Sequence, residues 1–143
     1  MVVSVAIPTF DKDGDLPPGI HDADWTEFKS RYGTTGHRRA LIRGLERALT
    51  SLAGAGCKRA YVDGSFVTSK RNPRDFDACW EEAGVDPTKL NPVLLNFNNQ
   101  RAAQKAVFGG ELFPVSAFLQ FFQTTRGGKA KGIVSLDLTR WKP

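Results

Sequence analysis

The segment GSFVTSKRNPRDFD, residues 64–77, carries the side chains of this sequence that are best suited to chemistry. Gly64 and Ser65 form a turn that offers backbone N–H groups and a hydroxyl, with no bulky side chain to block a ligand. Asp75 and Asp77 follow, and in a strand two residues at this spacing share a face, roughly 6–7 Å apart. Paired carboxylates are hard oxygen ligands of the kind that Mg²⁺ or Mn²⁺ binds. The segment therefore predicts a divalent cation site beside a phosphate-binding turn.

Basic side chains lie between the turn and the carboxylates. Lys70, Arg71 and Arg74 suit the charge of a nucleoside triphosphate, so that the segment holds the parts of a metal-dependent phosphoryl or nucleotidyl transfer site. A plainer interpretation stays open, in which Asp75 caps a turn and Asp77 pairs with a nearby arginine on the surface. Such an exposed pair would contribute only about 0–1 kcal/mol to stability.

The arrangement of Gly-Ser, about ten residues, and then Asp-x-Asp resembles the signature of the DNA polymerase β-like nucleotidyltransferase superfamily, of the minimal nucleotidyltransferase type. The expected order of a helix, a strand, the Gly-Ser turn and a strand with the Asp pair is similar as well. The segments LPPGIHDADWTEF and KGIVSLDL also look like an uncharacterised bacterial branch of that superfamily. The resemblance implies a nucleotidyltransferase-like fold over nearly the whole chain.

Residue roles follow from this resemblance. It implies that Gly64 and Ser65 contact the nucleotide phosphates, that Asp75 and Asp77 bind the metal, and that a third carboxylate on a neighbouring strand completes the site. Glu111 and Asp137 both remain candidates for this third carboxylate. We favour Glu111, because in the superfamily the third carboxylate usually comes soon after the Asp pair.

The resemblance also implies a reaction and a setting. A hydroxyl on a protein or an RNA would attack the α-phosphate of the triphosphate and release pyrophosphate, as in minimal members found in bacterial toxin–antitoxin or phage-defence loci. Three departures from the family pattern favour an alternative. Phe66-Val67-Thr68 replaces the x-Ala-Arg that often follows Gly-Ser, the third carboxylate is a Glu where the family usually has Asp, and no separate acceptor-binding domain is expected. The alternative is a catalytically silent module of the same fold that binds a partner protein or RNA.

Composition bounds these interpretations. The chain has 143 residues and 15.7 kDa, which predicts a single domain over residues 1–143. A net charge of +5 and a pI near 9.5 suit a polyanionic partner but also an ordinary basic surface. Two cysteines exclude a disulfide scaffold, and the absence of a long apolar run or of a signal peptide predicts a cytoplasmic protein that does not enter the membrane.

Hydrophobic periodicity and turn residues predict an α+β (or α/β-like) fold with a small mixed sheet flanked by helices. On the helix expected over residues 37–53, Arg38 and three further arginines are expected on a solvated face. Cys79 is expected as a packed small residue on the face of the Asp pair. The acidic loop with Asp11, Asp13 and Asp15 lacks the Gly and Glu of a calcium loop and is expected to be solvated. We expect strands over residues 3–10, 58–62, 75–80, 111–115 and 133–138, helices over 22–32, 37–53 and 116–123, and mostly helical or irregular structure over 84–107.

Overall fold

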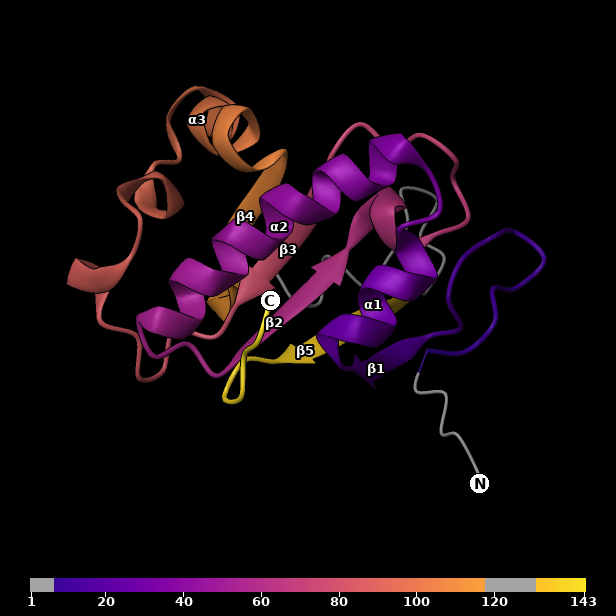
Figure 1. Ribbon diagram of the computed structural model, residues 1–143, viewed down its shortest axis with the longest axis horizontal. Helices are drawn as coiled ribbons and strands as arrows, with labels where there is room; N and C mark the ends of the chain where they lie inside the picture. The colour runs from indigo at the N-terminus through magenta and orange to yellow at the C-terminus, as the bar shows by residue number, and fades with distance from the viewer. Residues whose placement is uncertain (1–6, 118–130) are drawn as a thin grey trace.

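The chain folds around one mixed β-sheet with helices packed against it, as a computed structural model that describes residues 7–117 and 131–143 shows (Figure 1). The order of the strands in the sheet is β1-β5-β2-β3-β4. Strand β5 lies parallel to β1 and antiparallel to β2, whereas β3 lies antiparallel to β2 and parallel to β4. The five strands are β1 (Gly19–Ala23), β2 (Arg59–Asp63), β3 (Phe76–Trp80), β4 (Gly110–Pro114) and β5 (Gly132–Asp137). The α+β class predicted from the sequence is confirmed.

Three α-helices are described: α1 (Trp25–Tyr32), α2 (Gly36–Gly54) and α3 (Asn98–Phe108). Helix α1 begins where the Asp24 carboxylate accepts the Glu27 N–H, and α2 begins where the Thr35 hydroxyl accepts the Arg38 N–H. In Figure 1, α1 and α2 run across one face of the sheet, while α3 lies beside β4. No helix in the described ranges is long and apolar enough to cross a membrane.

The two faces of the sheet differ in character. The helix-covered face holds the main core, in which leucines of α2 such as Leu45 and Leu49 pack over Val62 and Ala78 of the central strands. The opposite face carries a small apolar cluster of Tyr61, Cys79 and Ile133. Cys79 is therefore a packed small residue, as expected, and the alternation in β3 that places it on the face of Asp77 is confirmed.

Three expectations about the elements are wrong. Residues 7–10 of the predicted strand are not in a strand, and its residues 3–6 lie outside the described part of the chain. The outer strand is instead β1, within a stretch whose Gly, Pro and Asp residues favoured a loop. Arg38 is 2% exposed, although all four arginines of α2 were expected on a solvated face. Of the helix expected over residues 116–123, residues 116 and 117 lie in a short 3₁₀ turn (Val115–Ala117). Residues 118–123 lie outside the described part of the chain, so the helix stays a prediction there.

Candidate active site

Acidic side chains meet at one end of the sheet. In the strand register, Asp77 of β3 lies directly opposite Asp63 of β2 on one side and Glu111 of β4 on the other. Neighbouring strands lie about 4.8 Å apart, so these three carboxylates are neighbours on one face. Asp75, two residues before Asp77, lies next to them just ahead of β3. We call Asp63, Asp75, Asp77 and Glu111 the carboxylate cluster.

The turn after β2 lies against this cluster. Gly64 has a φ of 77°, in the left-handed region that favours glycine, and it begins the 3₁₀ turn η1 (Gly64–Val67). A Cβ atom at Gly64 would lie 2.3 Å from Oδ2 of Asp77. The chain therefore needs glycine here for two reasons, its conformation and the close approach of the Asp77 carboxylate. The predicted Gly-Ser turn and the Asp pair are thus side by side.

Burial, together with repulsion from neighbouring acidic groups, raises the pKa values of the three aspartates in the cluster. The pKa of Asp77 rises to about 7, first because the group is buried and then because Asp75, Glu111 and Asp63 surround it. Burial and the charge of Glu111 also raise the pKa of Asp75. Burial raises the pKa of Asp63 to about 6, with the nearby Lys131 ammonium opposing the rise. Four acidic groups held this close favour the arrival of positive charge.

Part of that positive charge comes from the protein. The Lys131 ammonium lies 3.3 Å from Oδ1 of Asp63. The Lys105 ammonium and the Arg101 guanidinium lie 2.9 Å and 3.4 Å from Oε1 of Glu111. Arg101 lies in the first turn of α3, where the φ values of residues 99–101 are all positive. Within the described residues, Asp75 and Asp77 form no ion pair at all.

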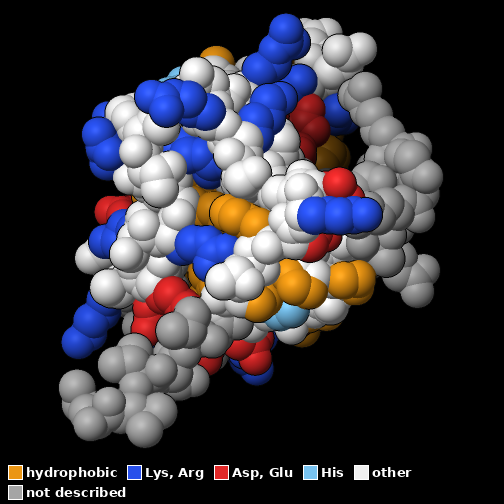
Figure 2. All heavy atoms as spheres, turned by 90° about the vertical axis from the view of Figure 1, so that its right-hand side faces the viewer, with side chains coloured by type: hydrophobic (Ala, Val, Ile, Leu, Met, Phe, Trp, Pro, Cys, Tyr) orange, Lys and Arg blue, Asp and Glu red, His pale blue; other side chains and the backbone are white. Residues whose placement is uncertain are grey.

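The predicted phosphate-binding cations lie on the loop that leads from η1 to β3. Lys70, Arg71 and Arg74 are all exposed, and the charges of Lys70 and Arg74 lower the pKa of Asp75. On the face shown in Figure 2, Lys and Arg side chains gather at the top, with acidic side chains set back between them. The loop thus places free positive charge next to the carboxylate cluster.

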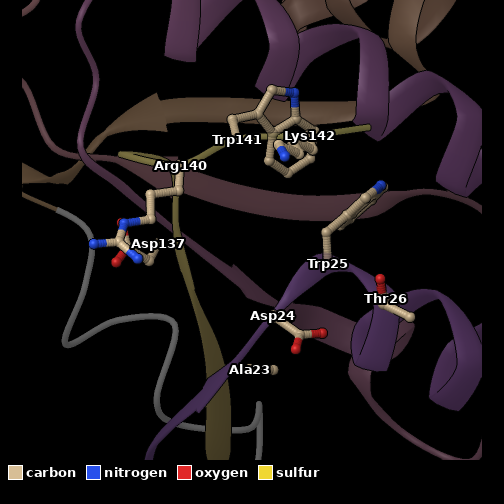
Figure 3. A pocket seen from close by; sticks show the side chains of 8 residues that line it. All are labelled: Ala23, Asp24, Trp25, Thr26, Asp137, Arg140, Trp141 and Lys142. Atoms are coloured by element: carbon tan, nitrogen blue, oxygen red, sulfur yellow. The ribbon is translucent and has the colours of Figure 1, made fainter.

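Asp137, the alternative third carboxylate, lies elsewhere. It pairs in register with Arg59, at the opposite end of β2 from Asp63. Its carboxylate accepts hydrogen bonds from the N–H and the hydroxyl of Thr139. It lines a separate cavity of about 340 Å³, together with Trp25 and Trp141 (Figure 3). Of the two candidates, the fold brings only Glu111 to the Asp pair.

The sequence interpretation missed Asp63. The strand expected over residues 58–62 stops one residue short of it, but Asp63 ends β2 and is 2% exposed. Strand alternation places Asp63 on the same face as Tyr61, which would have been the available signal. In this chain the acidic residue directly before the Gly-Ser turn therefore belongs to the strand and to the carboxylate cluster.

The donor types in the cluster suit a hard divalent cation. Asp75 and Asp77 offer carboxylate oxygens that no described cation occupies, so that they are the residues able to hold Mg²⁺ or Mn²⁺. Glu111 would have to exchange Lys105 and Arg101 for the metal. In the arrangement of the described residues, no three His, Cys, Asp or Glu side chains already converge on one metal position.

Comparison with known proteins gives a family and no function. The chain matches DUF6932, a family of unknown function, over residues 8–137. No curated protein and no solved structure matches it. The chain therefore belongs to DUF6932, and the carboxylate cluster and the Gly-Ser turn both lie within the matched region.

Proposed function

We propose that this protein is a nucleotidyltransferase with a nucleotidyltransferase-like fold, which uses Mg²⁺ or Mn²⁺ and a nucleoside triphosphate. It would move a nucleoside monophosphate to a hydroxyl on a protein or an RNA. The observation that carries the proposal is the register of β2, β3 and β4. That register brings Glu111, on a separate strand, to the Asp75–Asp77 pair and places the Gly64 turn against Asp77.

Each part of the site has a role in this reaction. Ser65 and the backbone after Gly64 would bind the triphosphate, with Lys70, Arg71 and Arg74 opposing its charge. Asp75 and Asp77, with Glu111, would hold the divalent cation, which neutralises phosphate charge when it is bound. The acceptor oxygen forms a bond to the α-phosphorus, the bond to the bridging oxygen breaks, and pyrophosphate leaves. The acceptor proton passes to a carboxylate of the cluster, for which Glu111 is our candidate.

A binding titration tests the first half of this proposal. The four ribonucleoside triphosphates are titrated by calorimetry into the protein, each with and without Mg²⁺. We expect metal-dependent binding of at least one of them. Asp77→Ala should abolish the metal-dependent part, because it removes the central carboxylate of the cluster. Asp137→Ala is the matched control, since its carboxylate lies at the other end of β2, and it should bind as the wild type does.

Transfer itself is tested with a triphosphate labelled in its α-phosphate, incubated with total RNA and with protein. Label that moves to either acceptor in the wild type, but not in Asp77→Ala, supports the proposal. If no triphosphate binds in a metal-dependent way, or if Asp77→Ala binds and transfers like the wild type, the proposal is wrong.

A specific observation favours a second candidate, a silent module that binds a partner protein or RNA. Lys131, Lys105 and Arg101 already neutralise two of the four carboxylates, so that the folded protein carries its own counter-charges. In such a module, Mn²⁺ would not compete with these lysines. Titration with Mn²⁺ alone separates the candidates, because a nucleotidyltransferase should bind the ion in a way that depends on Asp75 and Asp77.

A further inference from the structure

Arg38, in the first turn of α2, lies beneath the loop that follows Gly64. Arg38 is 2% exposed, and its guanidinium donates to three carbonyl groups of that loop. The distances are 2.7 Å to the oxygen of Phe66, 2.9 Å to that of Thr68 and 3.0 Å to that of Lys70. The guanidinium also lies over the Phe66 ring, 4.8 Å from its centroid. One side chain therefore fixes the backbone of residues 66–70.

His37, the residue before Arg38, holds the next part of the same loop. His37 contacts the carbonyl oxygen of Pro73 through its Nε2 atom. The outer side of the loop is tied down as well, because the Ser69 N–H donates to the carbonyl of Gly14 at 2.9 Å. The loop between the Gly-Ser turn and the Asp pair is thus held from both sides, with Lys70, Arg71 and Arg74 left exposed on it.

The charge of Arg38 has no counter-charge in the protein. All fifteen Asp and Glu residues lie within the described ranges, and none of them pairs with Arg38. Backbone carbonyls satisfy the N–H groups of Arg38, but they do not neutralise it. A buried charge without a counter-charge costs several kcal/mol, and its field reaches the side of the loop that carries Lys70, Arg71 and Arg74. This field favours a negative ligand on the other side of the loop.

We infer that Arg38 is a positioning residue for a polyphosphate. It fixes the backbone of the loop over residues 64–70, and it places an unpaired positive charge beneath that loop. The inference deepens the proposed function and rests on it for the identity of the ligand as a triphosphate. The exposed cations of the loop would meet the same ligand from the solvent side. Arg38 itself touches neither the ligand nor the metal.

The test compares ligands that differ only in charge. Phosphate, pyrophosphate and tripolyphosphate are titrated in the presence of Mg²⁺ into the wild type, Arg38→Met and the control Arg39→Met. Arg39 is the exposed neighbour, whose guanidinium contacts only the Gly33 carbonyl among the described residues. We expect Arg38→Met to bind tripolyphosphate at least tenfold more weakly, with a smaller loss for pyrophosphate and the smallest for phosphate. Arg39→Met should stay within twofold of the wild type.

A second readout separates positioning from general loss of structure. Mn²⁺ binding at Asp75 and Asp77 should change by less than twofold in Arg38→Met, because those carboxylates lie on β3 and just before it. Equal losses for all three phosphates, or a parallel loss of Mn²⁺ affinity, would overturn the inference. If Arg38→Met does not fold, Arg38→Lys is measured at pH 6. It keeps the positive charge, so it should bind tripolyphosphate, pyrophosphate and phosphate with the same order of affinities as the wild type. A folded Arg38→Lys that no longer distinguishes the three ligands would also overturn the inference.

The outcome is distinguishable from failure of the proposed function. If tripolyphosphate binding depends on Arg38 but no nucleotide is transferred, the inference stands and the nucleotidyltransferase proposal falls. If nucleotide is transferred and Arg38→Met binds polyphosphates like the wild type, the inference falls alone. A wild type that binds no tripolyphosphate overturns the inference directly.

Discussion

The two ends of β2 differ in how charged residues are paired across the sheet. At one end Asp63 lies opposite Asp77, a like-charged pair whose members are largely buried. At the other end Arg59 lies opposite Asp137, and its guanidinium also contacts the exposed carboxylate of Asp22 at 3.4 Å. Like charges directly opposite each other destabilise a sheet, whereas opposite charges stabilise it. One end is arranged as an ordinary sheet end, and the other is not.

This difference indicates that the end of the sheet with Asp63 and Asp77 is less stable than it would be without these like charges. Groups with strongly raised pKa values cluster at functional sites, because catalysis and ligand binding need charges that folding alone would remove. Asp63 and Asp77 have raised pKa values, whereas hydrogen bonds from Thr139 lower the pKa of Asp137. The same five-residue strand thus ends in a candidate site and in a conventional surface.

Removing one acid from each end should have very different effects on activity. If the proposed transfer is found, Glu111→Gln should lower kcat at least 100-fold, because it removes the candidate base beside Asp77. Asp137→Asn should stay within twofold of the wild type, since Asp137 lies at the other end of β2. Steady-state kinetics on both variants check this. An equal loss of kcat in the two variants would mean that the two ends of β2 do not differ in function.

The carboxylate end should become more stable when a charge is removed. The pKa of Asp77 is raised in the folded protein, so its contribution to stability is full at low pH and is lost as the pH rises from about 4 to about 7. Asp77→Asn removes this loss. At pH 8 without divalent cations, we expect a gain on the order of 2–4 kcal/mol in the free energy of unfolding over the wild type.

Urea denaturation at several pH values measures this gain. The advantage of Asp77→Asn should shrink to below about 1 kcal/mol near pH 4, because there the wild-type carboxyl is neutral in the folded state and about half ionised in the unfolded state. Mg²⁺ should stabilise the wild type but not the variant. A variant that is less stable than the wild type at pH 8 would show that the Asp77 charge is already balanced in the free protein.

A substitution at the Arg59 end of β2 should have the smallest effect on the free energy of unfolding. Arg59→Met keeps the apolar stem and removes a pair with Asp22, whose side chain is 81% exposed. Exposed pairs of this kind contribute about 0–1 kcal/mol, and salt screens them. We therefore expect a loss below about 1 kcal/mol that shrinks in concentrated salt, measured by the same urea titrations. A loss several times larger would place this end of β2 among the structurally essential parts of the sheet.

Local sequence patterns sufficed where chemistry and strand period agreed. The Gly-Ser turn, the closeness of Asp75 to Asp77, and the packed Cys79 all follow from residue type and spacing. The preference for Glu111 over Asp137 came from a family resemblance, and only strand pairing brings Glu111 next to Asp77.

Other features depend on contacts between distant segments, which local patterns do not contain. Strand β1 is stabilised by pairing with β5, against the loop preference of its own residues. Arg38 has the same local surroundings as Arg39, and only the loop that folds over it makes it a buried residue. Asp63 becomes part of the site through its pairing with Asp77.

The position of β5 in the sheet has a consequence for how the chain reaches its native state. This strand is the last of the five in sequence, yet it lies between β1 and β2. Until it is in place, β1 has no partner in the sheet, and one edge of β2 is open. Pairing of segments this far apart has a large entropic cost of loop closure, and this cost comes before any favourable contact between the strands forms. The sheet therefore closes late, and a chain emerging during synthesis exposes unpaired strand edges until residues 132–137 are available.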